Sequence, residues 1–205
     1  MGPPGHALGS RRCQGGGARE SAEGGIVLRR TLLASAATGV LVVVLPFVGG
    51  PGGAPGAVSA LGVQGTTSDD LASFAYQYNA IRVANCLEPV PYGNFYYDSC
   101  MEQRLFWMAE DPSLDPASAW GHEGSVRSDG VPSVGCDGNL AGGSDNSGST
   151  VARKWWESSA HRESLYRPGN TGSTAGVCIA FAMTHGGIPN EPYAFTRAAA
   201  RWTSC

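Results

Sequence analysis

Apolar side chains recur at helical spacing in the segment that follows Thr67. Ser68-Asp69-Asp70 places a hydroxyl and two carboxylates where the first backbone N–H groups of a helix lack partners. An apolar stripe then repeats at spacings of three, four and three, at Leu71, Phe74, Tyr78 and Ile81. The pattern predicts a helix that buries one side and ends near Asn85.

Further helices and two strands are predicted downstream. The helices run from about Asp98 to Glu110, from Ser149-Thr150 onward, and over Ala160–Tyr166, and the strands cover Gly176–Met183 and Tyr193–Trp202. In the second helix Met101, Leu105 and Met108 share one side. Because the helices precede the strands, we expect an α+β fold with a small antiparallel sheet.

Two segments lack this periodicity. Leu114–Ser149 is rich in Gly, Ser, Asp and Pro, and a loop this long tends to be functional or held by disulfides. His185 lies in the predicted hairpin turn Thr184–Pro192, where we expect it to be solvated.

The first sixty residues are predicted to be a Gly-rich extension with a secretory signal. Arg29-Arg30 precedes an apolar run over Leu32–Val48, and Val58-Ser59-Ala60 has the small residues of a signal-peptidase site. A membrane anchor that is not cleaved is the alternative, because the apolar run is about as long as the minimum membrane span. Residues 61–205 then form the folded domain, which has no stable membrane span if the signal is cleaved.

Charge argues against nucleic acid as a partner. The 205-residue chain has a formal net charge of -3, and residues 61–205 carry nine basic against 15 acidic residues. Binding to phosphate backbones requires clustered Lys and Arg, which this domain lacks.

The cysteines are consistent with export. Cys13 leaves with the predicted leader, and the two disulfides expected in an oxidising compartment leave one thiol unpaired among five residues, Cys86, Cys100, Cys136, Cys178 and Cys205. The pairing stays open. The chain has no CxxC motif, which makes a structural zinc site improbable on sequence grounds.

Two histidines lie in surroundings typical of a ligand pocket. His122 is flanked by Trp120 and Glu123, and His161 follows Trp155-Trp156 within a segment of small and polar residues.

Four motifs carry a family resemblance. In chain order they are Asn79-Ala80-Ile81-Arg82, Trp120-Gly121-His122, Asp137-Gly138-Asn139-Leu140-Ala141-Gly142-Gly143, and Trp155-x-x-Ser158-x-x-His161-Arg162 followed by Gly176-Val177-Cys178. In this order the chain resembles the CAP superfamily (PR-1-like and SCP-like domains), and most closely its secreted bacterial type. The resemblance implies an α-β-α sandwich with a central cleft.

In that family two histidines and one or two glutamates line the cleft and can hold a divalent metal such as zinc. His122 and His161 match the histidines, but the glutamate positions fall on Gly138 and Ser158. A zinc site would therefore need a further oxygen ligand, from Asp137 or Glu123.

Three functions are compatible with these features. The first is a secreted, non-catalytic module that binds a lipid, a sterol or a cell-envelope ligand in a cleft lined by five residues, His122, His161, Asn139, Ser158 and Glu123. The second is a metal-assisted hydrolase or protease that uses His122 and His161. The third is an extracellular structural or defence protein whose cleft is vestigial. In each case the domain lies outside the cell, either secreted or held by an N-terminal anchor.

Overall fold

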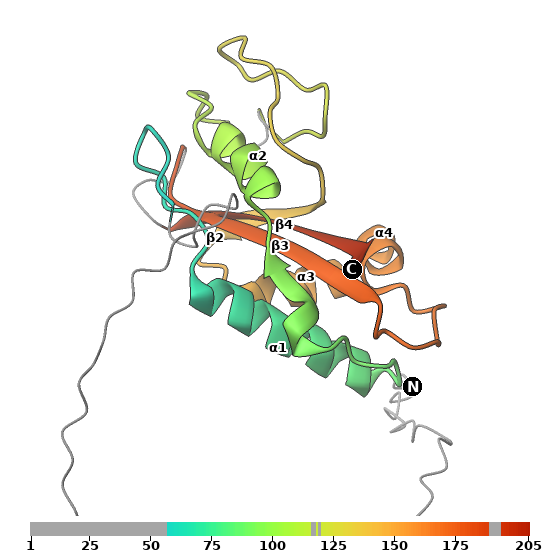
Figure 1. The fold of residues 1–205 in the computed structure, drawn as a ribbon. Helices are drawn as coiled ribbons and strands as arrows, with labels where there is room; N and C mark the ends of the chain where they lie inside the picture. Colours follow the sequence, from blue (N-terminus) through green and yellow to red (C-terminus); the bar gives the residue numbers. More distant parts are fainter. Residues whose placement is uncertain (1–56, 116–117, 119, 189–193) are drawn as a thin grey trace, which may run out of the picture. The chain divides into compact units, whose positions relative to one another are not determined.

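The structure is a computed structural model that describes residues 57–115, 118, 120–188 and 194–205 (Figure 1). The predicted leader lies outside these residues except for its last four, and so does part of the turn Thr184–Pro192. Ala57 accepts a hydrogen bond from Gly65 N–H at 2.7 Å, and Val58 pairs with Gln64 in an isolated bridge. Contacts of the folded domain therefore begin before the predicted boundary at residue 61.

A four-stranded mixed sheet forms the centre of the domain. Its order is β1 (Phe95–Tyr97), β3 (Val177–His185), β4 (Phe195–Ser204) and β2 (Asn139–Ser144). The predicted hairpin is present, since β3 and β4 are antiparallel, and β2 is antiparallel to β4. The prediction of a purely antiparallel sheet is wrong, because β1 pairs in parallel with β3. Its three residues are too few to give a sequence pattern.

Helices cover both faces of this sheet (Figure 1). On one face α1 (Ser68–Ala84) and α3 (Gly148–Glu157) pack against alternate side chains of β3 and β4, including Ile179 and Phe181. On the other face α2 (Ser99–Ala109) packs on the intervening Ala180 and Ala182. The α+β class is confirmed, with one apolar core on each side of the sheet.

The first helix begins as its sequence predicts. Thr67 Oγ1 accepts a hydrogen bond from Asp70 N–H at 3.2 Å, and the Asp70 carboxylate accepts one from Thr67 N–H at 2.9 Å. This reciprocal cap satisfies two N–H groups at the helix start. Phe74 and Tyr78 of the predicted stripe are fully buried, and the ring of Phe74 stacks on Phe181 at 4.3 Å.

One strand lies inside the segment predicted to be a loop. β2 has the sequence Asn-Leu-Ala-Gly-Gly-Ser, which contains no β-branched or aromatic residue. Its extended form comes from pairing with β4, from Asn139 opposite Ala200 to Ser144 opposite Phe195. Since this pairing is set by a partner more than fifty residues away, local sequence does not reveal it.

Two disulfides join described cysteines, as expected. Cys100–Cys136 ties the long loop to α2, and Cys178–Cys205 closes the end of the β3–β4 hairpin. The expected free thiol is absent from the described residues, because Cys86 is disulfide-bonded as well. In the described part of the chain, no helix is long and apolar enough to cross a membrane.

His185 is not the solvated turn residue that the sequence predicted. β3 continues two residues beyond its predicted end, so His185 is a strand residue with only 7% of its surface exposed. Its Nε2 lies 2.8 Å from Oδ2 of Asp70 in the cap of α1. The glycines that follow, Gly186 and Gly187, have φ of 88° and 93° and begin the turn.

Candidate functional site

The predicted site residues lie along and around β2, a strand at the edge of the sheet. Asp137 and Gly138 lead into this strand, and Asn139 is its first residue. The loop with His122 approaches from the side of α2. His161 is the last residue of α4 (Ser159–His161), a short helix that follows α3. It is followed directly by the π-helical turn η2 (Arg162–Tyr166).

A buried arginine holds the His122 loop against the start of β2. The guanidinium of Arg104, fully buried in α2, donates to the carbonyls of His122 at 3.3 Å and Gly135 at 3.4 Å. It also lies 3.6 Å from Asp137. Because a buried cation requires compensation, these contacts fix the loop to the strand entry.

Asp137 is the centre of the polar contacts around His122. Both of its carboxylate oxygens accept the backbone N–H of Glu123, at 3.0 and 2.9 Å, and one lies 3.7 Å from Nδ1 of His122. The His122 side chain is 70% exposed and that of Asp137 36% exposed, so this contact stabilises the fold little. His122 therefore presents its imidazole to solvent beside a carboxylate whose place is set by the backbone.

The second group of polar contacts joins Asn139 to η2. Ser164 Oγ donates to the Asn139 side-chain oxygen at 2.5 Å, and the Asn139 amide donates to Ala200 O at 3.1 Å. Asn139 thus links three elements, β2, β4 and η2, with both ends of its side chain engaged.

An electrostatic interaction connects the two histidines. Burial lowers the pKa of His161, and the charge of His122 lowers it further. Both histidine-bearing segments are attached to the start of β2, His122 beside Asp137 and the turn after His161 through the hydrogen bond from Ser164 to Asn139. The sequence separates them by nearly forty residues.

Ser158, three residues before His161, interrupts the helical backbone. Its backbone is extended, with φ of −79° and ψ of 121°. It ends α3 and precedes α4. Ser158 therefore marks the bend between the two helices.

Gly138 leaves no room for a larger side chain. A Cβ atom here would lie 2.8 Å from Sδ of Met101 and 3.1 Å from the carbonyl oxygen of Ala200. Met101 is fully buried in the core under α2. The close packing of α2 on β4 therefore accounts for glycine in this chain.

The residues described do not fit a three-ligand zinc site. Among them, no group of three or more His, Cys, Asp or Glu side chains is placed to hold a metal ion. The nearest carboxylate to His122, that of Asp137, already accepts two hydrogen bonds and faces Arg104.

Sequence patterns missed two residues that organise the site. Arg104 lies between Met101 and Leu105. A charged residue next to the apolar stripe of a helix was the signal by which the sequence could have identified it. Ser164 lies in a short polar stretch and offers no comparable signal. Both act by positioning the groups around His122 and Asn139.

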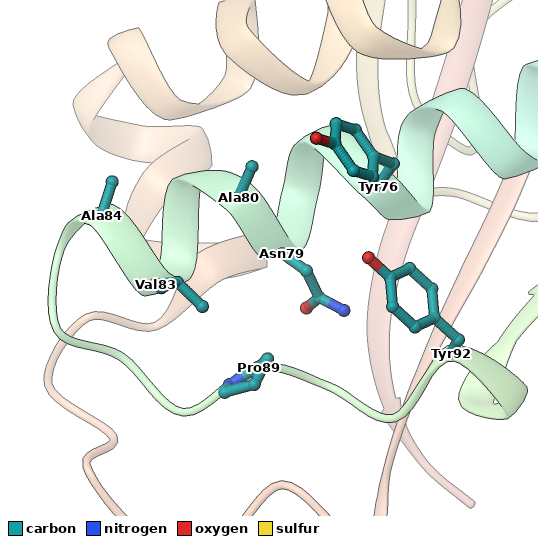
Figure 2. A pocket seen from close by; sticks show the side chains of 7 residues that line it. All are labelled: Tyr76, Asn79, Ala80, Val83, Ala84, Pro89 and Tyr92. Atoms are coloured by element: carbon teal, nitrogen blue, oxygen red, sulfur yellow. The ribbon is translucent and has the colours of Figure 1, made fainter.

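Among the residues that the structure describes, three cavities lie away from both histidines. One of about 510 Å³ lies between α1 and the segment that follows it, with Tyr76, Val83, Pro89 and Tyr92 in its wall (Figure 2). A second of about 400 Å³ adjoins it at Tyr92. The third, also about 510 Å³, is lined by Phe106 and Trp107 of α2 among others.

Comparison of the chain with protein-family models, with curated proteins and with solved structures finds no match.

Proposed function

We propose that residues 61–205 are a secreted CAP-type (SCP-like) domain that binds the polar part of a cell-envelope or lipid ligand between His122 and His161. The observation that carries this proposal is that both histidine-bearing segments attach to the start of β2. His122 Nδ1 lies 3.7 Å from Asp137, and Ser164 Oγ, which also lies 3.2 Å from the carbonyl oxygen of His161, donates to Asn139 two residues further along the chain. The family resemblance expects these two histidines in one cleft, and their attachment to neighbouring residues of the same strand supports that expectation.

The placement of the other motif residues also supports the proposal. The Trp120-Gly121-His122 segment is held by Arg104, Asp137-Gly138-Asn139 enters β2, and the segment around His161 contacts Asn139 through Ser164. Helices on both faces of a central sheet agree with the layers that the resemblance implies.

The chemistry of the surface favours binding. His122 and Glu123 are exposed, and His161 is half-buried, so imidazole and carboxylate groups are available to hydroxyl, amide or phosphate groups of a ligand. The Asp137 carboxylate is held by the backbone N–H of Glu123. These contacts are those of a pre-formed polar surface.

Two disulfides support an extracytoplasmic location, because such bonds persist in oxidising compartments. The predicted secretory signal points the same way, and the surplus of acidic residues favours a neutral headgroup or a glycan over an anionic lipid surface.

Cosedimentation of the purified protein with insoluble peptidoglycan, and with vesicles of phosphatidylcholine or phosphatidylglycerol, tests the proposal. We expect binding to peptidoglycan or phosphatidylcholine that weakens about fivefold in both His122→Ala and His161→Ala, the loss of roughly one hydrogen bond each. Glu88→Ala, an exposed change near the end of α1, is the control and leaves binding unchanged. Binding that neither histidine variant alters would refute the proposal.

A further inference from the structure

The solvent-facing side of α1 is apolar. Its exposed positions beyond the first turn recur at spacings of four, four, three and one, and they are Ala72, Tyr76, Ala80, Val83 and Ala84. A helix at the surface of a domain ordinarily presents charged and polar residues on this side. Since the opposite side of α1 already forms the core with β3 and α3, this helix has apolar residues on two sides.

Large apolar side chains continue this surface beyond the helix. Tyr76 is 66% exposed and Val83 56%, and Tyr92 of the turn η1 (Tyr92–Asn94) is 61% exposed. Figure 2 shows Tyr76, Ala80 and Val83 along α1, with Pro89 and Tyr92 on the segment that faces them. We call this surface, from Ala72 to Ala84 together with Pro89 and Tyr92, the α1 face.

The α1 face combines projecting rings with hollows. The cavity of about 510 Å³ lies over Ala80 and Ala84, and the cavity of about 400 Å³ lies over Ala72 and Ala75. Tyr92 belongs to the wall of both. A surface that carries both projections and hollows can be complementary to a copy of itself, as a two-fold interface requires.

Charge favours a second copy of the chain as the occupant. None of the residues that line the two cavities is charged, and the amide of Asn79 is engaged by the backbone of Val90 at 2.7 and 2.9 Å. Two acidic copies can therefore meet here without placing like charges in contact. Asp69 and Glu88, both exposed, lie near the two ends of the face, which disfavours an anionic lipid surface.

The exposed area is of the size that a dimer needs. With about 200 Å² for each tyrosine side chain, the exposed parts of Tyr76 and Tyr92 offer about 250 Å² together. Two copies therefore bury about 500 Å² through these rings alone, half of the roughly 1,000 Å² of a small specific interface. Val83, Pro89 and the exposed alanines of α1 add to this area. Tyrosine enrichment and depletion of charge are typical of interface centres.

We propose that two copies of this chain associate through the α1 face as a symmetric dimer, with Tyr76 and Tyr92 of each copy filling the hollows of the other. This interface does not depend on the proposed ligand site, since it uses neither His122 nor His161.

Sedimentation of the full-length chain over roughly 1–100 μM tests the dimer. We expect a concentration-dependent monomer–dimer equilibrium that Tyr76→Lys and Val83→Lys each weaken at least about tenfold, because each buries a charge at the interface. Leu114→Lys, at a 79% exposed apolar residue outside the α1 face, is the matched control and leaves the dimer unchanged. All variants share residues 1–56, so self-association through that segment is equal in each.

Circular dichroism checks that the variants are folded, which we expect because both changed residues are exposed. A wild-type chain that stays monomeric at every concentration overturns the proposal. Dimerisation that resists both substitutions overturns it as well. A monomer that binds phosphatidylcholine vesicles, and loses this binding in Tyr76→Lys, overturns it in favour of a lipid on the same face.

Discussion

At the scale of single residues, Asp70 makes more contacts than a helix cap requires. Its carboxylate accepts hydrogen bonds from Thr67 N–H and Thr67 Oγ1 and lies 2.8 Å from Nε2 of His185. Burial alone would raise the pKa of Asp70, but the contacts with His185 and Thr67 outweigh it and hold the pKa below its ordinary value of 3.8. Asp70 therefore joins the start of α1 to the end of β3 as a carboxylate.

Asp70→Asn should lower the free energy of unfolding at neutral pH by about 2–4 kcal/mol, from a weakened cap and a lost charged hydrogen bond. Because the folded state lowers the pKa of Asp70, its contribution is present above pH 3.8 and is lost as the pH falls further. Urea unfolding of both proteins between pH 7 and pH 3 measures this. The difference between them should shrink towards pH 3, and a constant difference would contradict the assignment. Ser173→Ala, in an exposed loop, serves as control.

His161 offers a direct measure of how close the two histidines lie. Since the charge of His122 contributes to the low pKa of His161, His122→Ala should raise that pKa. The pKa of His161 should still remain below 6.5, because burial lowers it more than His122 does and is unchanged in the variant. An NMR titration of the His161 imidazole measures both values. An unchanged pKa in His122→Ala would place the two rings too far apart to share a site.

At the scale of elements, the disulfide Cys100–Cys136 acts on the site through the loop that carries His122. The bond closes a separation of 36 residues between α2 and the entry to β2, and Cys136 N–H donates to the carbonyl of Cys100 at 2.9 Å. The loop is thus held at both its disulfide and Arg104, although it contains little regular structure.

Replacing both Cys100 and Cys136 by Ser should lower the free energy of unfolding by about 2–4 kcal/mol, since the unfolded chain gains loop freedom. The control replaces both Cys178 and Cys205 by Ser, which removes a disulfide that joins residues 27 positions apart. It should lower the free energy of unfolding by a similar amount. Denaturant titration compares the two. Only the first variant should also change the pKa of His161, because only this bond holds the His122 loop. Equal effects of both pairs on that pKa would contradict this account.

The elements also mark where prediction from sequence succeeds. Local signals sufficed for α1, because its cap and its stripe of Phe74, Tyr78 and Ile81 lie within one segment. They failed for β1 and β2, which extend only because distant strands pair with them. His185 was misplaced for the same reason, since its partner Asp70 lies 115 residues earlier. Motifs predicted that His122 and His161 share a site, which stays a prediction, whereas the buried Arg104 that holds the backbone of His122 became visible only in the packed structure.

At the scale of the whole molecule, one sheet separates two cores that depend on the same two strands. Phe181 faces the aromatic core under α1 and α3, while Ala180 and Ala182 face the smaller core under α2. Neither core is complete without β3 and β4. The described residues all belong to one compact unit, so loss of either core removes support from the other.

This arrangement predicts a single cooperative unfolding transition. Leu105→Ala, in the core under α2, should lower the free energy of unfolding by about 2–5 kcal/mol, and Phe181→Ala, in the other core, by about 3–5 kcal/mol. In both variants the far-ultraviolet circular dichroism and the tryptophan fluorescence should change at one denaturant concentration. Trp107 reports on the first core and Trp155 on the second, so fluorescence senses both. If Leu105→Ala instead gave an early fluorescence change with the dichroism preserved, the layer of α2 would unfold independently. In that case the core on one face of the sheet would contribute little to the stability of the core on the other face. The loop that carries His122 would then be held only by its own contacts.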